Sequence, residues 1–254
     1  MTILTTLRRV AWPLVLLAAP VALAAPAHAA RPSEAEIQAK IDADLAAAAK
    51  AEAEARAAGA PRPAPPPPET TKPAEPARTY QTVPVVITTS LGSFTLAIET
   101  ERAPITAANF LAYVDQKRFD GTAFYRSFKW DDGTPGGFIQ GGTQNDPKRI
   151  LKPVPHEPTS KTGLSHVEGV ISVAQGAPGT GTGDFFIIIG NMTGFDATAD
   201  LPGFAAFGRV VSGMEVIRAI ADAPRSPTLG EGVMKGQMLE PQIRILSARR
   251  ALTS

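Results

Sequence analysis

A cation lies among aromatic residues in the stretch "TAFYRSF", where Arg126 follows Phe124 and Tyr125 and precedes Phe128. The run has the composition of a β-strand, and a guanidinium buried in a strand is costly unless it is paired or directed at a ligand. Two interpretations are open at this point: Arg126 is a solvated surface residue, or it faces a groove in which a substrate completes its contacts. The segment ends in "GFIQGG", which contains Gln140.

Other patterns could carry chemistry, but each departs from what that chemistry requires. The stretch "GAPGTGTGDFFIIIG" has no Gly-Lys-Ser/Thr and runs into a strand, which favours a wide turn over a phosphate loop. In "GLSHVEG", Val167 replaces the second glycine of a hydrolase nucleophile elbow. The candidate metal ligands are His156, Glu157, His166 and Glu168. They lack cysteine and helical histidine spacing, so we expect structural histidines, no metal and no cofactor.

The composition and the first residues indicate an exported protein. The 25 basic and 24 acidic residues nearly balance, which argues against a nucleic-acid partner, and the absence of cysteine excludes disulfides and a thiol nucleophile. At the N-terminus Arg8 and Arg9 precede an apolar run that ends near the small-residue pattern "AHA". This order is typical of a cleavable signal peptide, here residues 1–29, and predicts the periplasm of a bacterium and no membrane span after cleavage.

Two segments of biased composition separate the signal from the folded domain. Residues 30–60 are rich in alanine, and Ser33 with Glu36 forms a capping box, so a helix with little apolar surface is expected. Residues 61–79 hold eight of the chain's 24 prolines and predict an extended linker. A single domain is therefore expected over residues 80–250.

Within that domain, many short strand-like runs alternate with few helical ones. The stretch "VPVVITTSLGSFTLAIE" predicts two strands around a turn, and further short strands are expected at "TAFYRSF", "GFIQGG", "GVISVA", "DFFIIIG", "AAFGRVV" and "PQIRILSA". Helices are expected at "APITAANFLAYVDQ", with Pro104 at its start, and at "SGMEVIRAIAD". This order predicts a mainly β fold, a closed antiparallel barrel with helices over its ends.

Four blocks in this order, "FDGTAFYRSF", "GFIQGG", "GVISVAQGAPGTGTGDFFI" and "FAAFGRVVSGMEVI", resemble the cyclophilins, a family of peptidyl-prolyl isomerases, or rotamases. The resemblance extends over roughly residues 83–248. It implies an eight-stranded barrel capped by two α-helices and the isomerisation of X-Pro bonds without a cofactor.

The resemblance also implies roles for individual residues. Arg126 matches the catalytic arginine. Gln140 matches the glutamine of the Gln-Gly-Gly motif and is expected to be the second catalytic residue, which fixes a backbone carbonyl or amide of the substrate beside the proline. The residues that match substrate-binding positions are Phe124, Phe138, Ala174, Gln175, Phe186, Phe195 and Phe204. His166 matches a histidine that belongs to the fold.

The chain also departs from the family pattern in its pocket. Tyr125 stands where the family usually has histidine, and Gly137 stands where it has a pocket phenylalanine, for which Phe128 or Trp130 are the candidate replacements. Phe195 is the nearest substitute for the family's tryptophan, and Phe204 replaces its histidine.

The chemistry of proline isomerisation gives an independent reason for the arginine. Rotation of an X-Pro amide has a barrier of ~18–20 kcal/mol. A guanidinium that donates a hydrogen bond to the prolyl nitrogen stabilises the twisted amide more than either planar isomer. Two functions remain open: a monomeric isomerase that acts on X-Pro bonds in unfolded or flexible exported proteins, and a catalytically weak protein-binding module with the same fold.

Overall fold

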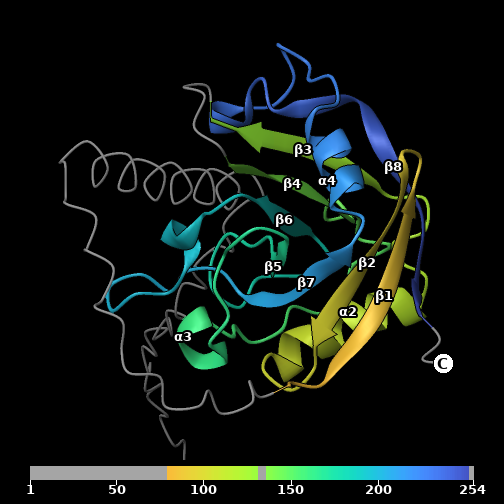
Figure 1. The fold of residues 1–254 in the computed structure, drawn as a ribbon. Helices are drawn as coiled ribbons and strands as arrows, with labels where there is room; N and C mark the ends of the chain where they lie inside the picture. The colour runs from red at the N-terminus through yellow and green to blue at the C-terminus, as the bar shows by residue number, and fades with distance from the viewer. Residues whose placement is uncertain (1–78, 131–135, 252–254) are drawn as a thin grey trace, which may run out of the picture. The chain divides into compact units, whose positions relative to one another are not determined.

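The structure, a computed structural model, describes residues 79–130 and 136–251. The predicted signal peptide, the predicted Ala-rich helix and all but one residue of the predicted linker lie outside these residues. Eight strands form a closed barrel in the described part of the chain (Figure 1). Their bounds are β1 Thr82–Thr89, β2 Gly92–Glu99, β3 Ala123–Lys129, β4 Gly137–Gly142, β5 Val170–Val173, β6 Phe185–Ile189, β7 Ala206–Ser212 and β8 Met238–Arg250.

The strands follow the order β1-β2-β7-β5-β6-β4-β3-β8 around the barrel, and β8 pairs back onto β1. Every neighbouring pair is antiparallel. Closure satisfies the backbone hydrogen bonds on both sides of each strand, so the sheet has no open edge. The predicted eight-stranded antiparallel barrel is confirmed.

Aromatic rings fill the interior of the barrel. Phe124 packs edge-to-face against Phe185, with ring centroids 5.7 Å apart, and Phe110 contacts both Phe185 and Phe207. Such tilted and edge-to-face pairs add to the stabilisation that burial of apolar area provides. The interior core therefore depends on residues from β3, β6, β7 and the first described helix.

Helices cover the two ends of the barrel, as the sequence predicts. Helix α2, Pro104–Asp115, begins after a short turn that follows β2, with Pro104 in its first turn. Glu157, far away in sequence, accepts hydrogen bonds from the Thr106 backbone nitrogen and hydroxyl at 2.7 and 2.8 Å and so satisfies an orphan donor of this helix start. Helix α4, Met214–Ala221, packs over the other end, where the Val216 side chain lies close to Gly92 at the start of β2.

A third, short helix was not predicted: α3 spans Thr159–Thr162 and ends at Gly163 in a left-handed conformation. Two 3₁₀ turns, Thr193–Phe195 and Gly232–Met234, lie in the long connections after β6 and α4. None of the helices within the described ranges has the length and apolar character needed to cross a lipid bilayer. The strands β3, β4, β5 and β6 are buried over most of their length on both faces. Other side chains must therefore cover the outer face of these strands, and these side chains form part of the candidate site described next.

Candidate active site

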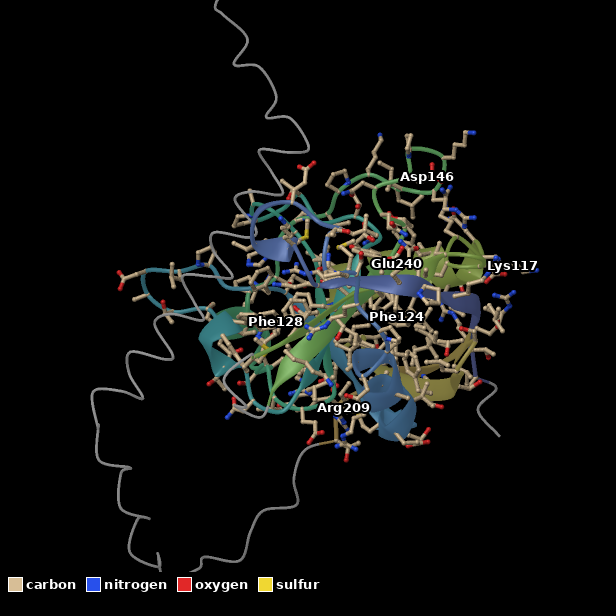
Figure 2. All side chains as sticks on the ribbon, turned by 90° about the horizontal axis from the view of Figure 1, so that it is seen from above. Lys117, Phe124, Phe128, Asp146, Arg209 and Glu240 are labelled. Carbon is tan, nitrogen blue, oxygen red and sulfur yellow. The ribbon has the colours of Figure 1, made fainter. Side chains whose placement is uncertain are left out.

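A β-bulge in β3 decides which residues face outward. Phe124 pairs with Gly141 on β4, whereas Arg126 pairs with Gln140, so Tyr125 is the extra residue between two successive pairs. The bulge shifts the alternation, and Phe124 belongs to the interior core while Arg126 lies on the outer face beside Phe138. Figure 2 shows Phe124 and Phe128 at separate places along β3. The expectation that Phe124 lines the groove beside Arg126 is therefore corrected, because the two side chains lie on opposite faces of the strand.

The Arg126 side chain is buried, with 1% of its surface exposed, which rules out the solvated-surface interpretation. Its Nε donates to the Gln237 side-chain oxygen at 2.9 Å, and its Nη1 donates to the Gln140 side-chain oxygen at 3.1 Å. The guanidinium carbon also lies 5.1 Å from the centroid of the Phe138 ring. Two amide oxygens and one ring thus fix the plane of the guanidinium.

Gln237 is a site residue that the sequence analysis missed. It precedes β8 and is separated from Arg126 by 111 residues. Its own amide nitrogen donates to the Val233 carbonyl, which orients the side-chain oxygen toward Arg126. No motif surrounds it, and only the pairing of β8 with β3 brings it to the site.

An apolar cluster covers the outer face of β4 and β6 beside Arg126. We call it the outer cluster, and its buried members are Phe138, Phe186, Ile188, Met192, Phe195 and Phe204, with the partly buried Phe128, Trp130 and Ala174 packed against them. Phe186 pairs with Gln140 across β6 and β4 and packs edge-to-face on Phe204 at 5.3 Å. The structure thus brings together five of the seven predicted substrate-binding residues.

Phe128 and Trp130 supply the aromatic surface that the sequence lacks at Gly137. The Phe128 ring stacks on Phe138 at 5.3 Å, and Trp130 packs edge-on against Phe128 at 4.9 Å. Gly137 has φ of 152°, and a Cβ atom there would lie 2.1 Å from the Phe128 carbonyl oxygen. No side chain fits at position 137 on β4, so the aromatic surface there comes from Phe128 on the neighbouring strand β3 and from Trp130, which follows that strand.

His166 packs against aromatic residues of the outer cluster. It is fully buried, its Nδ1 lies 2.6 Å from the Asp196 carboxylate, and its Nε2 lies 3.0 Å from the Ser172 hydroxyl. The imidazole is stacked on Phe186 with centroids 6.0 Å apart. Burial opposes ionisation of Asp196, but hydrogen bonds from His166 and Ser165 hold the pKa of this carboxyl below its ordinary value. These contacts give His166 a structural role, as the resemblance implies.

Gln175, the remaining predicted substrate-binding residue, is buried next to Ala174 and hydrogen-bonded to a histidine. Its Nε2 lies 2.8 Å from His156 Nδ1, and His156 Nε2 lies 3.1 Å from the Pro202 carbonyl oxygen. Because a carbonyl only accepts, Nε2 carries the proton and Nδ1 accepts from the glutamine. This pairing orients the Gln175 amide.

The candidate metal ligands serve separate structural purposes. Glu157 caps α2, His156 and His166 have the partners just described, and Glu168 pairs with Arg218 on α4. Among the residues that the structure describes, no group of three or more His, Asp or Glu side chains could hold a metal ion.

Two further buried polar side chains, Tyr125 and Asp184, extend the hydrogen-bonded contacts from Arg126 and Gln140. Gln140 Nε2 donates to the Tyr125 hydroxyl at 2.7 Å, and that hydroxyl lies 3.5 Å from the Asp184 carboxylate. Burial, followed by the charge of Asp184, raises the pKa of Tyr125 well above its ordinary value. Burial also raises the pKa of Asp184, although backbone N–H groups of Gln144 and Asn145 oppose this effect.

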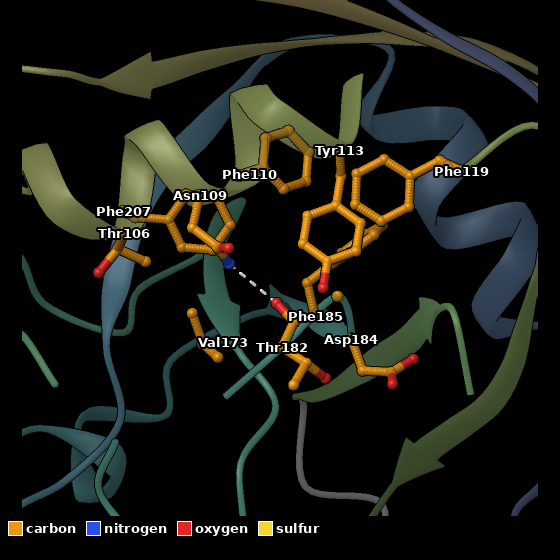
Figure 3. A pocket seen from close by; sticks show the side chains of 11 residues that line it. Thr106, Asn109, Phe110, Tyr113, Phe119, Val173, Thr182, Asp184, Phe185 and Phe207 are labelled. Carbon is orange, nitrogen blue, oxygen red and sulfur yellow. Dashed lines mark hydrogen bonds between the residues drawn. The ribbon is translucent and has the colours of Figure 1, made fainter. Parts of the chain in front are cut away.

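Asp184 also borders a small pocket in the interior of the barrel (Figure 3). The pocket lies between α2 and the strands, beside the rings of Phe110, Tyr113 and Phe119, and the Asn109 amide donates to the Thr182 carbonyl across it at 2.9 Å. Arg126 and the outer cluster do not line it. The arrangement suited to chemistry is therefore the outer face, where a guanidinium of fixed plane adjoins an aromatic wall.

Comparison with known proteins identifies relatives over most of the barrel. Residues 84–250 match the protein family described as "Cyclophilin type peptidyl-prolyl cis-trans isomerase/CLD". A peptidyl-prolyl cis-trans isomerase of Acinetobacter baylyi is 32% identical over 146 residues, which are 56% of this chain and 73% of that protein. Peptidyl-prolyl cis-trans isomerase A of Dickeya dadantii is 34% identical over 139 residues, or 54% of this chain and 70% of that protein.

Solved structures share the fold. A crystal structure of a cyclophilin type peptidyl-prolyl cis-trans isomerase from Cryptosporidium parvum has a TM-score of 0.56 at 19% identity and covers 68% of this chain and 100% of its own. A second structure of that protein, in the presence of the dipeptide Ala-Pro, has a TM-score of 0.54 at 20% identity and covers 67% of this chain and 99% of its own. At this identity the likeness concerns the barrel alone.

Proposed function

The chain belongs to the cyclophilin type peptidyl-prolyl cis-trans isomerases and is such an enzyme, and from this premise we propose that Arg126 catalyses the isomerisation of X-Pro bonds in exported proteins. The observation that carries the proposal is the guanidinium itself, held by Gln140 and Gln237 in one plane beside the outer cluster. A buried cation of fixed orientation is suited to stabilise charge that develops only in a transition state.

The proposed mechanism uses residues of this chain alone. The proline ring packs against the outer cluster, in which Phe138 lies beside the Arg126 guanidinium and Phe186 is paired with Gln140 across β6 and β4. A guanidinium N–H donates to the prolyl nitrogen as its lone pair leaves the amide resonance. This hydrogen bond is strong in the twisted state and weak in either planar isomer, so it lowers the barrier without tighter binding of the ground state. Each ~1.4 kcal/mol gained in this way accelerates rotation about tenfold.

Proline-containing segments of flexible or unfolded polypeptides are the proposed substrates. The Cryptosporidium parvum relative was crystallised in the presence of Ala-Pro, a dipeptide of this class. The side chains of the outer cluster are all apolar, which suits a proline ring, and the neighbour of Ala174 in the chain, Gln175, adds a side-chain amide.

A protease-coupled assay on short Xaa-Pro peptides tests this activity. The chain from residue 30 onward should accelerate the cis-to-trans step in proportion to enzyme concentration, and Arg126→Ala should remove nearly all of the acceleration. An Arg126→Ala protein that remains folded and as active as the parent would show that the catalytic group lies elsewhere.

The proposed location is the periplasm, reached by a cleavable signal over residues 1–29, and the proposed state there is a monomer. The signal-like order of the first residues supports the location. N-terminal sequencing of protein recovered from the periplasmic fraction should begin at Ala30 or Arg31. Material that begins at Met1 would argue against processing, and light scattering of the purified protein tests the monomer.

A further inference from the structure

We propose that Tyr125, the bulge residue of β3, is a positioning residue for the isomerase reaction, because its hydroxyl orients the Gln140 amide that holds Arg126. The inference rests on the catalytic role proposed for Arg126. It concerns a position at which this chain departs from the family's usual histidine. The contacts form one chain, Arg126 to Gln140 to Tyr125 to Asp184, and all four side chains are buried.

The direction of every hydrogen bond in this chain follows from the chemistry of its members. A guanidinium only donates, so the Gln140 side-chain oxygen must face Arg126, at 3.1 Å. The Gln140 nitrogen must then face Tyr125, at 2.7 Å, and the hydroxyl oxygen must accept from it. If the Gln140 amide turned over, two donors would face each other at Arg126. Arg126 thus sets the orientation of the amide, and the Tyr125 hydroxyl reinforces it by accepting from the Gln140 nitrogen while its own hydrogen is directed at Asp184.

The far end of the chain is anchored by the backbone. Asp184 accepts from the backbone nitrogens of Gln144 at 2.8 Å and Asn145 at 3.1 Å. The Tyr125 hydroxyl, having accepted from Gln140, directs its hydrogen toward the Asp184 oxygen, 3.5 Å away. This contact is long and weak, so the position of the hydroxyl depends mainly on the burial of the tyrosine ring and on the 2.7 Å hydrogen bond from Gln140.

Loss of the hydroxyl should lower the rate of rotation and leave peptide binding unchanged. In Tyr125→Phe the ring still fills its space, but Gln140 Nε2 loses its acceptor in a region where only 5% of the Gln140 side chain is exposed. The amide can then turn away from Arg126. The outer cluster contains neither residue, so the affinity for an Xaa-Pro peptide should stay within twofold of the parent while kcat falls about five- to tenfold.

A double-mutant cycle separates positioning from general destabilisation. If Tyr125 acts through Gln140, then Tyr125→Phe should cost nothing further in a Gln140→Ala background. The matched control is Tyr113→Phe, which also removes a buried hydroxyl, one that accepts from the Leu151 backbone nitrogen at 2.7 Å on the interior side of the barrel. The control should lower thermal stability and leave kcat unchanged.

NMR should measure two quantities: the rate of cis–trans exchange of the bound Xaa-Pro peptide, which reports on kcat, and the dissociation constant of the peptide. Thermal unfolding should be measured on the same samples. A kcat loss in Tyr125→Phe that disappears in the Gln140→Ala background supports the inference. A folded Tyr125→Phe protein with the parent's kcat, or losses that simply add, would overturn it and leave the role of Arg126 intact. A fully active Arg126→Ala protein would instead overturn the catalytic assignment on which the inference depends.

Discussion

Substitution of Arg126 tests the site most directly, and the structure gives the expected size of the effect. Lysine keeps the charge but lacks the planar, forked array of donors of a guanidinium. It cannot donate to the side-chain oxygens of Gln140 and Gln237 and also donate to the prolyl nitrogen. A hydrogen bond that involves a charged group contributes about 1.5–3 kcal/mol. Arg126→Lys should therefore lower kcat/KM about 10- to 100-fold. Arg126→Ala, which removes the donor, should lower it about 10²- to 10³-fold.

The same substitution has a smaller consequence for stability. Arg126→Ala leaves the buried oxygen of Gln140 without its donor, which costs about 1–3 kcal/mol, whereas Gln237 is only half-buried and its oxygen can accept from water instead. Domains of this size have about 5–15 kcal/mol of stability, so the protein should remain folded with a Tm lower by about 2–12 °C.

Turnover in the protease-coupled assay and thermal unfolding should be measured on the same preparations. Arg209→Ala is a suitable control, because Arg209 lies on β7 and pairs with Glu99 at 3.2 Å, away from the outer cluster. The control should match the parent in turnover. Two results would refute the reasoning: an Arg126→Ala protein that is folded and as active as the parent, or one that unfolds at 25 °C, which would make the arginine a structural residue.

Further expectations concern the pH dependence, the backbone and the N-terminal segment. The pKa of Asp196 is lowered in the fold, so its carboxylate stabilises the protein fully above the unfolded pKa near 4, and this contribution is lost progressively as pH falls from there through the lower folded pKa. Asp196→Asn should cost about 1–3 kcal/mol in urea unfolding at pH 7 and less at pH 3, and a cost independent of pH would contradict this. Gly137→Ala should cost more than about 4 kcal/mol or prevent folding, because its Cβ would lie 2.1 Å from the Phe128 carbonyl oxygen, and near-parental stability would show that the strand can shift. Residues 31–78 contain few large apolar side chains, so their deletion should leave Tm and turnover nearly unchanged, and a large drop in either would show that they pack on the domain.

Patterns of local sequence were sufficient for the architecture. Alternating apolar residues in short runs, two helical segments and the four family blocks predicted a closed eight-stranded barrel with helices over its ends, and the structure confirms this. The short helix α3 was missed because its four residues, Thr159–Thr162, carry no periodic signal. The boundaries of the signal, the Ala-rich segment and the linker remain predictions.

The placement of single side chains shows where local patterns stop being informative. The alternation of a regular strand would put Phe124, Arg126 and Phe128 on one face. One extra residue at Tyr125 reverses this for Phe124, and nothing in the local sequence marks a bulge that contains no glycine. The replacement of the missing phenylalanine by Phe128 and Trp130 likewise depends on two neighbouring strands being in register.

The sequence by itself determined the class of fold, the family and the pair Arg126 and Gln140, because these depend on residue order along a few continuous blocks. Only the tertiary structure decided that Gln237 and Asp184 complete the polar contacts around that pair. Both come from segments that meet β3 and β4 only when the barrel closes, Gln237 across 111 residues from Arg126. A hydrogen bond between such segments depends on strand register and on side-chain direction within an ångström. Neither quantity can be read from the periodicity of a single segment, so Arg126 and Gln140 were visible in the sequence, whereas Gln237 and Asp184 were not.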